Sequence, residues 1–428
     1  MSEYIVDFHL HSKYSRAVSR DMNLEEMSIW GEKKGIDVLA CADFTHPEWF
    51  RELRTKLVLQ PNGLYKLKGT KTHFILSTEL SAIYTQDGKV HRIHIVIILP
   101  TLETIEKFNA SLAAEGANLK ADGRPILGMS AEHIAGLAKQ ASPKAMIIPA
   151  HIWTPWFSMF GSKSGFNSLK ECFGKFAKDI HAVETGLSSD PAMNWRLSQL
   201  DDIQIVSSSD AHSMRKMGRE ATVFELDSLS YDSIRTATEN PNSKNKIAYT
   251  IEFFPEEGKY HFDGHMKCKV RMSPGETKRA KGICPKCGRP VTVGVMNRVE
   301  NLADRPEMDP KNPPAMQAKA FEASRPPFKS IVPLQEIIAD AFGVGDASKR
   351  VQAEYEKIIA HVGNEFFVLL HAPKEKIAEF ADEMVVEGIM RVREGKLHIL
   401  PGFDGEFGMV KVFTDEERKP RSKQKSLL

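Results

Sequence analysis

The chain has 428 residues, a hydrophobic content of 42% and a formal net charge of +2. This length allows two or three domains with a sizeable core, and the near-neutral charge excludes a protein that binds nucleic acid over its whole surface. No apolar run reaches the roughly 18 residues of a membrane span, and a strand occupies the place of a signal peptide. Five cysteines, three of them between residues 268 and 287, indicate a metal-binding group rather than disulfides. We expect a soluble, cytoplasmic protein.

Short β-rich runs alternate with helical patterns over roughly the first 230 residues. The range 24–34 is predicted to be an amphipathic helix, with Asn23 as its N-cap and Gly35 as its C-terminal stop. Such alternation predicts an α/β fold, with a largely parallel sheet closed into a TIM-like barrel of about seven βα units. The predicted strands are 4–10, 37–42, 74–80, 93–99, 145–150, 180–184 and 203–208. The other predicted helices are 130–141, 169–178, 193–200 and 231–239.

Histidines and carboxylates follow most of the predicted strands. Strand alternation places His9 and His11 on one face, and Asp210 with His212 repeats this spacing after another apolar strand. A barrel gathers its strand ends at one mouth, so ligands distant in sequence converge there. Imidazole and carboxylate donors suit zinc, manganese, iron or magnesium, and so many of them indicate two or three divalent ions. The candidate ligands are His9, His11, Asp43, Glu79, His94, His151, Glu184, Asp210 and His212.

Several divalent ions in one pocket favour hydrolysis of phosphate esters. They lower the pKa of a bound water and neutralise charge on the phosphate oxygens. Glu79 is the candidate bridging carboxylate, and Glu79, Asp210 and His212 are the candidate catalytic residues.

The same residues resemble a known family. His9-Leu10-His11-Ser12, followed by Ser15, resembles the first motif of the polymerase-and-histidinol-phosphatase (PHP) domain, and the later motifs match in order. The resemblance implies a PHP-type (β/α)7 barrel, which we place at residues 1–250, and adds His46 as a ligand. Asp43-Phe44-Thr45-His46 replaces the family's adjacent Asp-His, so either Asp43 or His46 contacts metal. The ligand role of His94, which lies within its predicted strand, rests partly on the resemblance.

A metal knuckle follows the barrel. His265-Met266-Lys267-Cys268 and Cys284-Pro285-Lys286-Cys287 are separated by fifteen residues, the H-x2-C…C-x2-C spacing of zinc knuckles. We expect a zinc-binding domain at 251–300, with one structural zinc. Its ligands are His265, Cys268, Cys284 and Cys287, although His261 competes with His265.

Basic residues gather around this knuckle. They favour local contacts with a polynucleotide, and a solvated face is the alternative. They are Lys267, Lys269, Arg271, Lys278, Arg279, Lys281, Lys286 and Arg289, the first five being our substrate-binding candidates.

The last third is predicted to be mainly helical over 301–415. It opens with a proline-rich linker at 301–330 and continues with helices at 334–341, 348–360 and 374–387. The tail at 416–428 is basic and predicted to be flexible. Its last residues, Gln424–Leu428, resemble a sliding-clamp-binding tail, which would make a clamp a partner.

Two classes of function fit this organisation. One is hydrolysis of a small phosphate monoester, as in biosynthetic phosphatases that share the barrel, and the other is cleavage of DNA. A small monoester needs neither a basic knuckle nor about 180 residues beyond the barrel, so we favour a nuclease.

A second resemblance is more specific. The segments 15–20, 43–49, 260–265, 282–288 and 295–305 together are similar to the endonuclease Q family. The resemblance covers nearly the whole chain. It implies a DNA repair enzyme that cleaves 5′ to a deaminated base (uracil, hypoxanthine or xanthine) or an abasic site, leaving the lesion on the downstream strand.

An aromatic segment follows His151 and leaves the barrel mouth. Trp153 and Trp156 within it are candidates for contact with an extruded base. The alternative is that these aromatic side chains seal the barrel.

Overall fold

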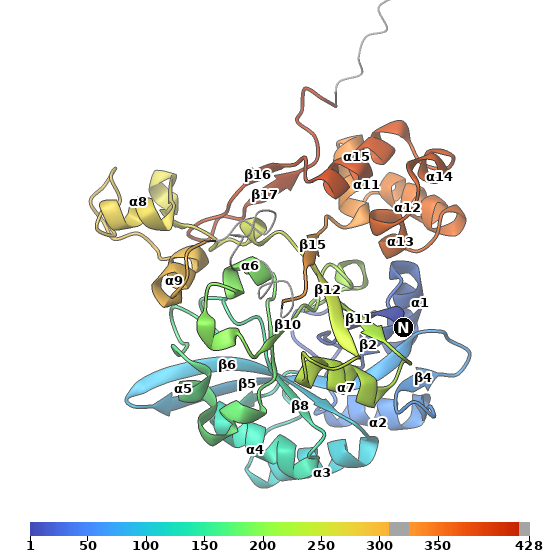
Figure 1. Ribbon diagram of the computed structural model, residues 1–428, viewed down its shortest axis with the longest axis vertical. Helices are drawn as coiled ribbons and strands as arrows, with labels where there is room; N and C mark the ends of the chain where they lie inside the picture. The colour runs from blue at the N-terminus through green and yellow to red at the C-terminus, as the bar shows by residue number, and fades with distance from the viewer. Residues whose placement is uncertain (308–324, 419–428) are drawn as a thin grey trace, which may run out of the picture.

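The computed structural model describes residues 1–307 and 325–418. A barrel, a small segment with a Cys/His cluster and a helical region follow one another along the chain (Figure 1). The predicted clamp-binding residues 424–428 lie outside the described residues. Within the two described ranges, no helix is long and apolar enough to cross a membrane.

Seven strands form the barrel wall, and each of them was predicted. Hydrogen bonds join them in the order β1-β2-β5-β6-β8, and β9 pairs with β10. β8 lies beside β9, and a bridge between Leu10 and Ala211 returns the chain after β10 to the end of β1. The strands are β1 (Ser2–Asp7), β2 (Val38–Ala40), β5 (His73–Gln86), β6 (Lys89–Leu99), β8 (Met146–Pro149), β9 (Ala182–Glu184) and β10 (Gln204–Val206).

The wall is largely parallel, as predicted, and one strand is reversed. β6 runs antiparallel to both β5 and β8. Asp87 and Gly88, with φ of 50° and 74°, form the two-residue turn between β5 and β6. Positive φ at both positions is typical of a tight hairpin, which leaves no room for a crossover helix.

Additional strands extend the sheet beyond the ring. β11 pairs antiparallel with β1, and β12 continues this edge. β15, which lies in the predicted linker, pairs with β12, so the segment after residue 301 contributes to the barrel sheet. These strands are β3 (Leu57–Leu59), β4 (Tyr65–Leu67), β7 (Ile126–Leu127), β11 (Ala221–Leu226), β12 (Lys246–Glu252) and β15 (Phe328–Ser330).

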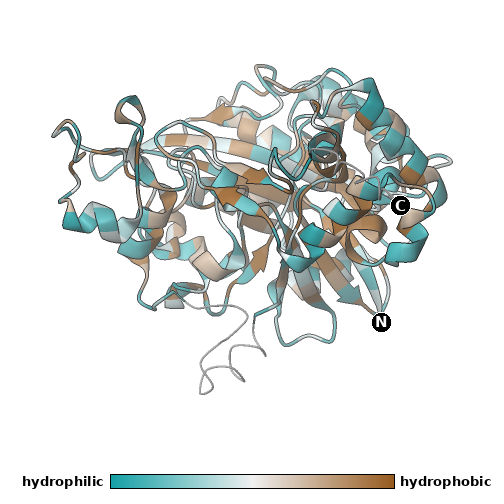
Figure 2. Ribbon diagram, turned by 90° about the horizontal axis from the view of Figure 1, so that it is seen from above, coloured by the Kyte–Doolittle hydropathy of each residue, from teal (hydrophilic) through white to brown (hydrophobic). Residues whose placement is uncertain are grey.

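Helices cover the outside of this sheet (Figure 1). α1 begins after Asn23, whose side chain accepts from the backbone N–H of Glu26, and ends at Gly35 with φ of 85°, as predicted. Hydrophobic residues concentrate on the interior strands, and hydrophilic residues on the outer helices (Figure 2). The helices are α1 (Leu24–Lys34), α2 (Pro47–Lys56), α3 (Leu102–Ala114), α4 (Ala131–Ala141), α5 (Leu169–Phe173), α6 (Pro191–Asn194) and α7 (Tyr231–Glu239).

The Cys/His segment is a compact unit with its own small core. A hairpin and two helices surround Val270, Met272, Cys284 and Val291. Its elements are β13 (Asp263–His265), β14 (Val270–Met272), α8 (Pro274–Arg279) and α9 (Val295–Leu302).

The C-terminal region is a helical cluster followed by a hairpin. The predicted helix 374–387 is two helices, because Asp382 accepts from the backbone N–H of Met384 and starts a new one. A buried ion pair of 2.7 Å between Lys34 and Glu365 joins this cluster to α1. The elements are α11 (Leu334–Phe342), α12 (Lys349–His361), α13 (Glu365–Leu370), α14 (Lys374–Ala378), α15 (Glu383–Glu394), β16 (His398–Leu400) and β17 (Met409–Lys411).

Candidate metal centre and active-site cavity

Glu79 lies at the centre of two groups of metal-ligand side chains. Its Oε2 is 3.5 Å from His9 Nε2 and 3.2 Å from His11 Nε2. Its Oε1 is 2.7 Å from His94 Nδ1 and 3.1 Å from His151 Nε2. Each carboxylate oxygen therefore faces a different group, which is the geometry of a carboxylate that can bridge two cations. The groups are His9, His11, Glu79 and Asp210, and Glu79, His94 and His151.

These side chains come from different parts of the barrel wall. His9 and His11 follow β1, and Asp210 follows β10. Glu79 and His94 lie within the long strands β5 and β6 rather than at strand ends. The extended hairpin carries both residues to the mouth that the other strands reach at their ends.

Asp43 and Glu184 hold the histidines rather than joining either group. Glu184 lies 3.0 Å from His9 Nδ1 and accepts from the backbone N–H of His151. Asp43 Oδ1 lies 3.3 Å from His11 Nδ1, while its Oδ2 accepts from both Ser12 and Ser15. Carboxylates on the far nitrogen of an imidazole fix its tautomer and raise its basicity as a ligand.

The loops that carry site residues have an uncommon backbone conformation. Asp43, His151 and Asp210 have φ of 40°, 29° and 46°. Residues other than glycine seldom adopt positive φ, and such conformations cluster at functional sites where the surroundings enforce them. The turn after β2, β8 and β10 thus directs each side chain into the mouth.

The electrostatics of the mouth fit a bound divalent cation. Burial alone would raise the pKa of Glu79, but His94, Arg124 and His9 hold it well below its usual range. Burial would lower the pKa of His9, but the carboxylates of Glu184, Glu79 and Asp210 raise it well above its usual range. The buried carboxylate of Glu79 is therefore ionised and demands positive charge nearby. His9 Nε2 is also buried without a hydrogen-bond partner among the described residues, so it is free to ligate.

Two further predicted ligands, besides Asp43 and Glu184, lie outside both groups. His46 stacks on Tyr14, with ring centroids 4.3 Å apart, and belongs to neither group, so its role as a ligand stays a prediction. Of the two alternatives after β2, only Asp43 contacts the cluster. The His212 ring lies 4.5 Å from the His11 ring, and its Nδ1 is 2.9 Å from the carbonyl oxygen of Asp210. His212 therefore stands at the edge of the site.

Arg124 is a site residue that the sequence reading missed. Its guanidinium donates to Glu79 Oε2 at 3.0 Å, and it lines the cavity beside the cluster. Gly123 lets this loop approach, because a Cβ there would lie 2.3 Å from Asp43 Oδ2. The sequence signal was faint, since Arg124 follows no strand.

A cavity of about 720 Å³ opens beside the cluster. His94, Arg124, His151 and Asp210 form its polar wall. Aromatic side chains also line it, with Trp156 and Tyr260 in edge contact at a centroid distance of 5.5 Å. The cavity therefore places flat apolar surfaces next to the metal-ligand groups.

The two candidate tryptophans differ in position. Trp156 lines the cavity and is 36% exposed. Trp153 is buried, and its Nε1 donates to Asn194 at 2.7 Å, so the prediction that it contacts a base is corrected. The aromatic segment thus combines two roles: Trp153 seals the barrel, and Trp156 faces the cavity.

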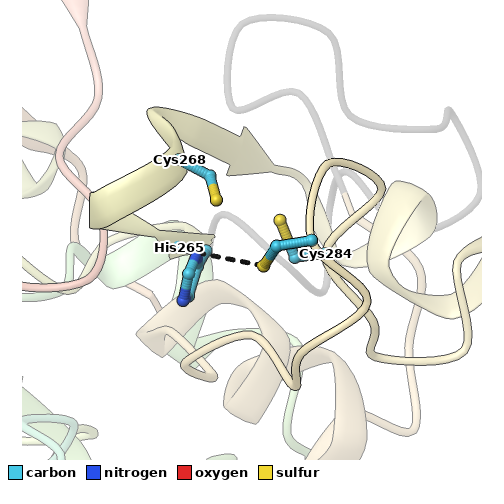
Figure 3. A group of neighbouring side chains, drawn as sticks. His265, Cys268 and Cys284 are labelled. Atoms are coloured by element: carbon cyan, nitrogen blue, oxygen red, sulfur yellow. Dashed lines mark hydrogen bonds between the residues drawn. The ribbon is translucent and has the colours of Figure 1, made fainter.

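The four residues of the predicted knuckle converge. The donor atoms of His265, Cys268, Cys284 and Cys287 all lie within 4.8 Å of one another, and Figure 3 shows the three labelled side chains pointing together. Burial would raise the pKa of Cys284, but the backbone N–H groups of Lys286 and Cys287 lower it. His261 is buried elsewhere, packed on Phe262. A Cys3His set of this kind suits structural zinc.

The basic residues of this segment are all exposed. Lys269 pairs with Glu406 at 2.6 Å, and Arg271 donates to the carbonyl of Pro401 at 2.9 Å. These contacts tie the segment to the β16–β17 turn. The exposed set is Lys267, Lys269, Arg271, Lys278, Arg279, Lys281, Lys286 and Arg289.

Family models and curated proteins match parts or all of the chain. A PHP-associated model matches residues 193–240, and a model of the MJ0043 C-terminal domain matches residues 333–396. The uncharacterized protein MJ0043 of Methanocaldococcus jannaschii is 34% identical over 265 residues, which are 60% of this chain but only 31% of that protein. The uncharacterized protein YqxK of Bacillus subtilis is 29% identical over 430 residues, covering 96% of this chain and 100% of that protein.

Two solved structures match the whole fold. The lesion-specific endonuclease PfuEndoQ of Pyrococcus furiosus has a TM-score of 0.83 and 30% identity, with 98% of each chain covered. Endonuclease Q in complex with a 27-mer duplex substrate, with an abasic lesion at the active site, has a TM-score of 0.82 and 30% identity, with 99% of each chain covered. The metal-ligand groups and the fold agree with these similarities, and the chain belongs to the endonuclease Q family.

Proposed function

We propose that this protein is a divalent-metal-dependent DNA repair endonuclease that cleaves the phosphodiester 5′ to deaminated bases and to abasic sites. The deaminated bases are uracil, hypoxanthine and xanthine. One observation carries the proposal: a cavity of about 720 Å³ is lined both by metal-ligand side chains and by aromatic side chains. A nucleotide extruded from a duplex requires both, because its base stacks while its phosphate meets the reacting groups. Similarity to a structure described with an abasic duplex supports the same reading.

The metal-ligand groups would hold the cations. His9, His11, Glu79 and Asp210 would hold one, and Glu79, His94 and His151 a second. The bound ions would supply Lewis-acid activation of water and charge neutralisation at phosphorus. Glu184 and Asp43 would keep the imidazoles of His9 and His11 oriented through the contacts described above.

The remaining residues of the site would handle charge and protons. Arg124 has guanidinium N–H groups beside Glu79 and faces the cavity, so it would donate to a non-bridging phosphate oxygen. His212 would donate its Nδ1–H to the Asp210 carbonyl and keep Nε2 free to accept a proton at the edge of the cluster. Burial lowers the pKa of His212, which favours the neutral acceptor form.

The exposed basic segment would bind the phosphate backbone away from the lesion. Lys267, Lys278 and Arg279 are exposed around the Cys3His group, for which we propose one structural zinc. Such contacts position a duplex without reading its sequence, which suits an enzyme that must find a rare lesion in any sequence.

A substrate panel tests the proposal. End-labelled duplexes with uracil, hypoxanthine, an abasic site or no lesion, and a chromogenic phosphate monoester, are incubated with wild type and with Asp210→Asn. Nicking of lesion duplexes by wild type alone supports it. Release of phosphate from the monoester with the DNA intact would favour the small-molecule phosphoesterase instead.

A further inference from the structure

Phe407 is the most exposed large hydrophobic residue in the described part of the chain. Its exposed fraction is 73%, and it lies on the turn 401–408 between β16 and β17. An isolated aromatic ring in water lacks the stabilisation that burial provides. Single exposed hydrophobic residues are common, so a role for Phe407 has to follow from what surrounds it.

The turn that carries Phe407 is fixed on the protein. The backbone N–H of Gly402 donates to Glu256, and that of Gly408 donates to Glu257, at 2.8 and 3.0 Å. Added Cβ atoms at Gly402 and Gly408 would lie 2.5 and 2.0 Å from backbone oxygens of the segment 256–258. The two glycines therefore permit a close backbone contact on either side of the turn, and Phe407 projects from a rigid support.

This support stands at the lip of the active-site cavity. Phe407 and Gly408 line the cavity together with Trp156 and Tyr260. Lys259 bridges the lip, with its Nζ 5.6 Å from the Tyr260 ring and 5.7 Å from the Phe407 ring. Aromatic faces with a lysine among them match a nucleic acid, which offers bases to stack on and phosphates to attract the cation.

The same turn touches the basic segment. Glu406, the residue before Phe407, pairs with Lys269 at 2.6 Å. A duplex lying across the exposed lysines and arginines would therefore reach the cavity at Phe407. The exposed basic residues and the Phe407 ring therefore lie along one path for the duplex.

We propose that Phe407 inserts into the base stack of duplex DNA next to the extruded nucleotide and occupies the gap that it leaves. This inference rests on the proposed function and adds the residue that holds the duplex open. Extruding a base costs the loss of its stacking on both neighbours, and an inserted apolar side chain restores one stacking surface. The prediction is specific to double strands, since a single strand has no partner strand and no gap to fill.

Phe407→Ala tests the inference, with Ile399→Ala as the matched control. Ile399 is 42% exposed on β16 of the same hairpin and does not line the cavity. Single-turnover nicking is measured on duplex and single-stranded oligonucleotides that carry the same abasic analogue. We expect the ratio of duplex to single-strand rate to fall about tenfold or more in Phe407→Ala and to stay at the wild-type ratio in Ile399→Ala. Phe407→Trp, which keeps a stacking face, should recover most of the ratio.

A fluorescence readout makes the outcomes distinguishable. A 2-aminopurine beside the lesion should brighten when Asp210→Asn protein binds the duplex, and this rise should be lost in the Asp210→Asn, Phe407→Ala double variant. If wild type nicks the duplex and Phe407→Ala leaves the ratio unchanged, or lowers both rates equally, the inserted-residue role is wrong while the nuclease proposal stands. If wild type neither nicks nor perturbs the 2-aminopurine, the proposed function itself fails and this inference with it.

Discussion

The guanidinium of Arg124 lies 3.0 Å from Oε2 of Glu79, the carboxylate that joins both metal-ligand groups. A fixed donor at this place can stabilise the negative charge that develops on a phosphate oxygen as the phosphodiester breaks. Since Arg124 also faces the cavity, it belongs to the reacting part of the site rather than to the barrel wall.

Arg124→Gln should lower kcat for nicking an abasic duplex by about 100- to 1000-fold, the usual effect of removing one donor to a developing oxyanion. Arg124→Lys should lie between wild type and Arg124→Gln, because it keeps the charge but loses the planar fork. Single-turnover rates with saturating enzyme check this. Arg54→Gln, at an exposed position on α2, is the control. A rise in KM with kcat unchanged would contradict the role.

The contact between Asp43 and His11 predicts which residue after β2 supports metal binding. Asp43→Asn weakens the acceptor that orients the imidazole, so metal affinity should fall about 10- to 100-fold. His46→Ala removes a ring that stacks on Tyr14, and metal content should change little. Titration of the metal-free proteins with zinc or manganese distinguishes them, and a greater loss in His46→Ala would reverse the assignment.

Trp153 and Trp156 should contribute to different properties, the first to the stability of the fold and the second to recognition of the base. Trp153→Ala opens a cavity in a closed core and breaks a hydrogen bond to Asn194, a change that costs about 3–5 kcal/mol of unfolding free energy. Trp156→Ala should leave stability near wild type and lower nicking of uracil duplexes more than of abasic duplexes, which offer no base to stack. Denaturant midpoints and paired rates measure both, and equal losses on the two substrates would count against base contact by Trp156.

A buried pair of glutamates behind the mouth predicts pH-dependent stability. Burial raises the pKa of Glu252 above its ordinary value of 4.5, and burial together with the charge of Glu252 raises that of Glu220. The folded protein thus keeps a proton that the unfolded chain releases, so stability falls as pH rises above about 4.5. Glu252→Gln mimics the protonated form. Its stability advantage over wild type should grow between pH 5 and pH 8, measured by urea unfolding, with exposed Glu48→Gln as the control. An advantage independent of pH would contradict this.

Much of the metal centre could be predicted because strand periodicity carries the information. His9 and His11 are two residues apart after an apolar strand, and Asp210 follows another, so convergence at a barrel mouth follows from the fold. The seven wall strands appeared as apolar runs for the same reason. The direction of β6 could not be predicted in this way, because an apolar run looks alike in either orientation. The turn at Asp87-Gly88 was not predicted to be a hairpin.

Other parts of the site depend on contacts between distant segments. Arg124 and Phe407 come from loops, where no periodicity marks a functional position. Trp153 and Trp156 are three residues apart in one aromatic run, and only packing decides which of them is sealed in the core. His46 lies near Asp43 in sequence, but its ring is captured by Tyr14.

The proposed function requires that cations held around Glu79 support cleavage of DNA beside a lesion. The most direct test maps the nick in a 5′-labelled duplex with a single abasic site, using wild type before chelation, after chelation and after divalent metal is restored. We predict one product ending immediately 5′ to the lesion, lost with chelator, regained with metal and absent with Asp210→Asn. Cleavage that persists without metal, or that persists in Asp210→Asn, would contradict the account.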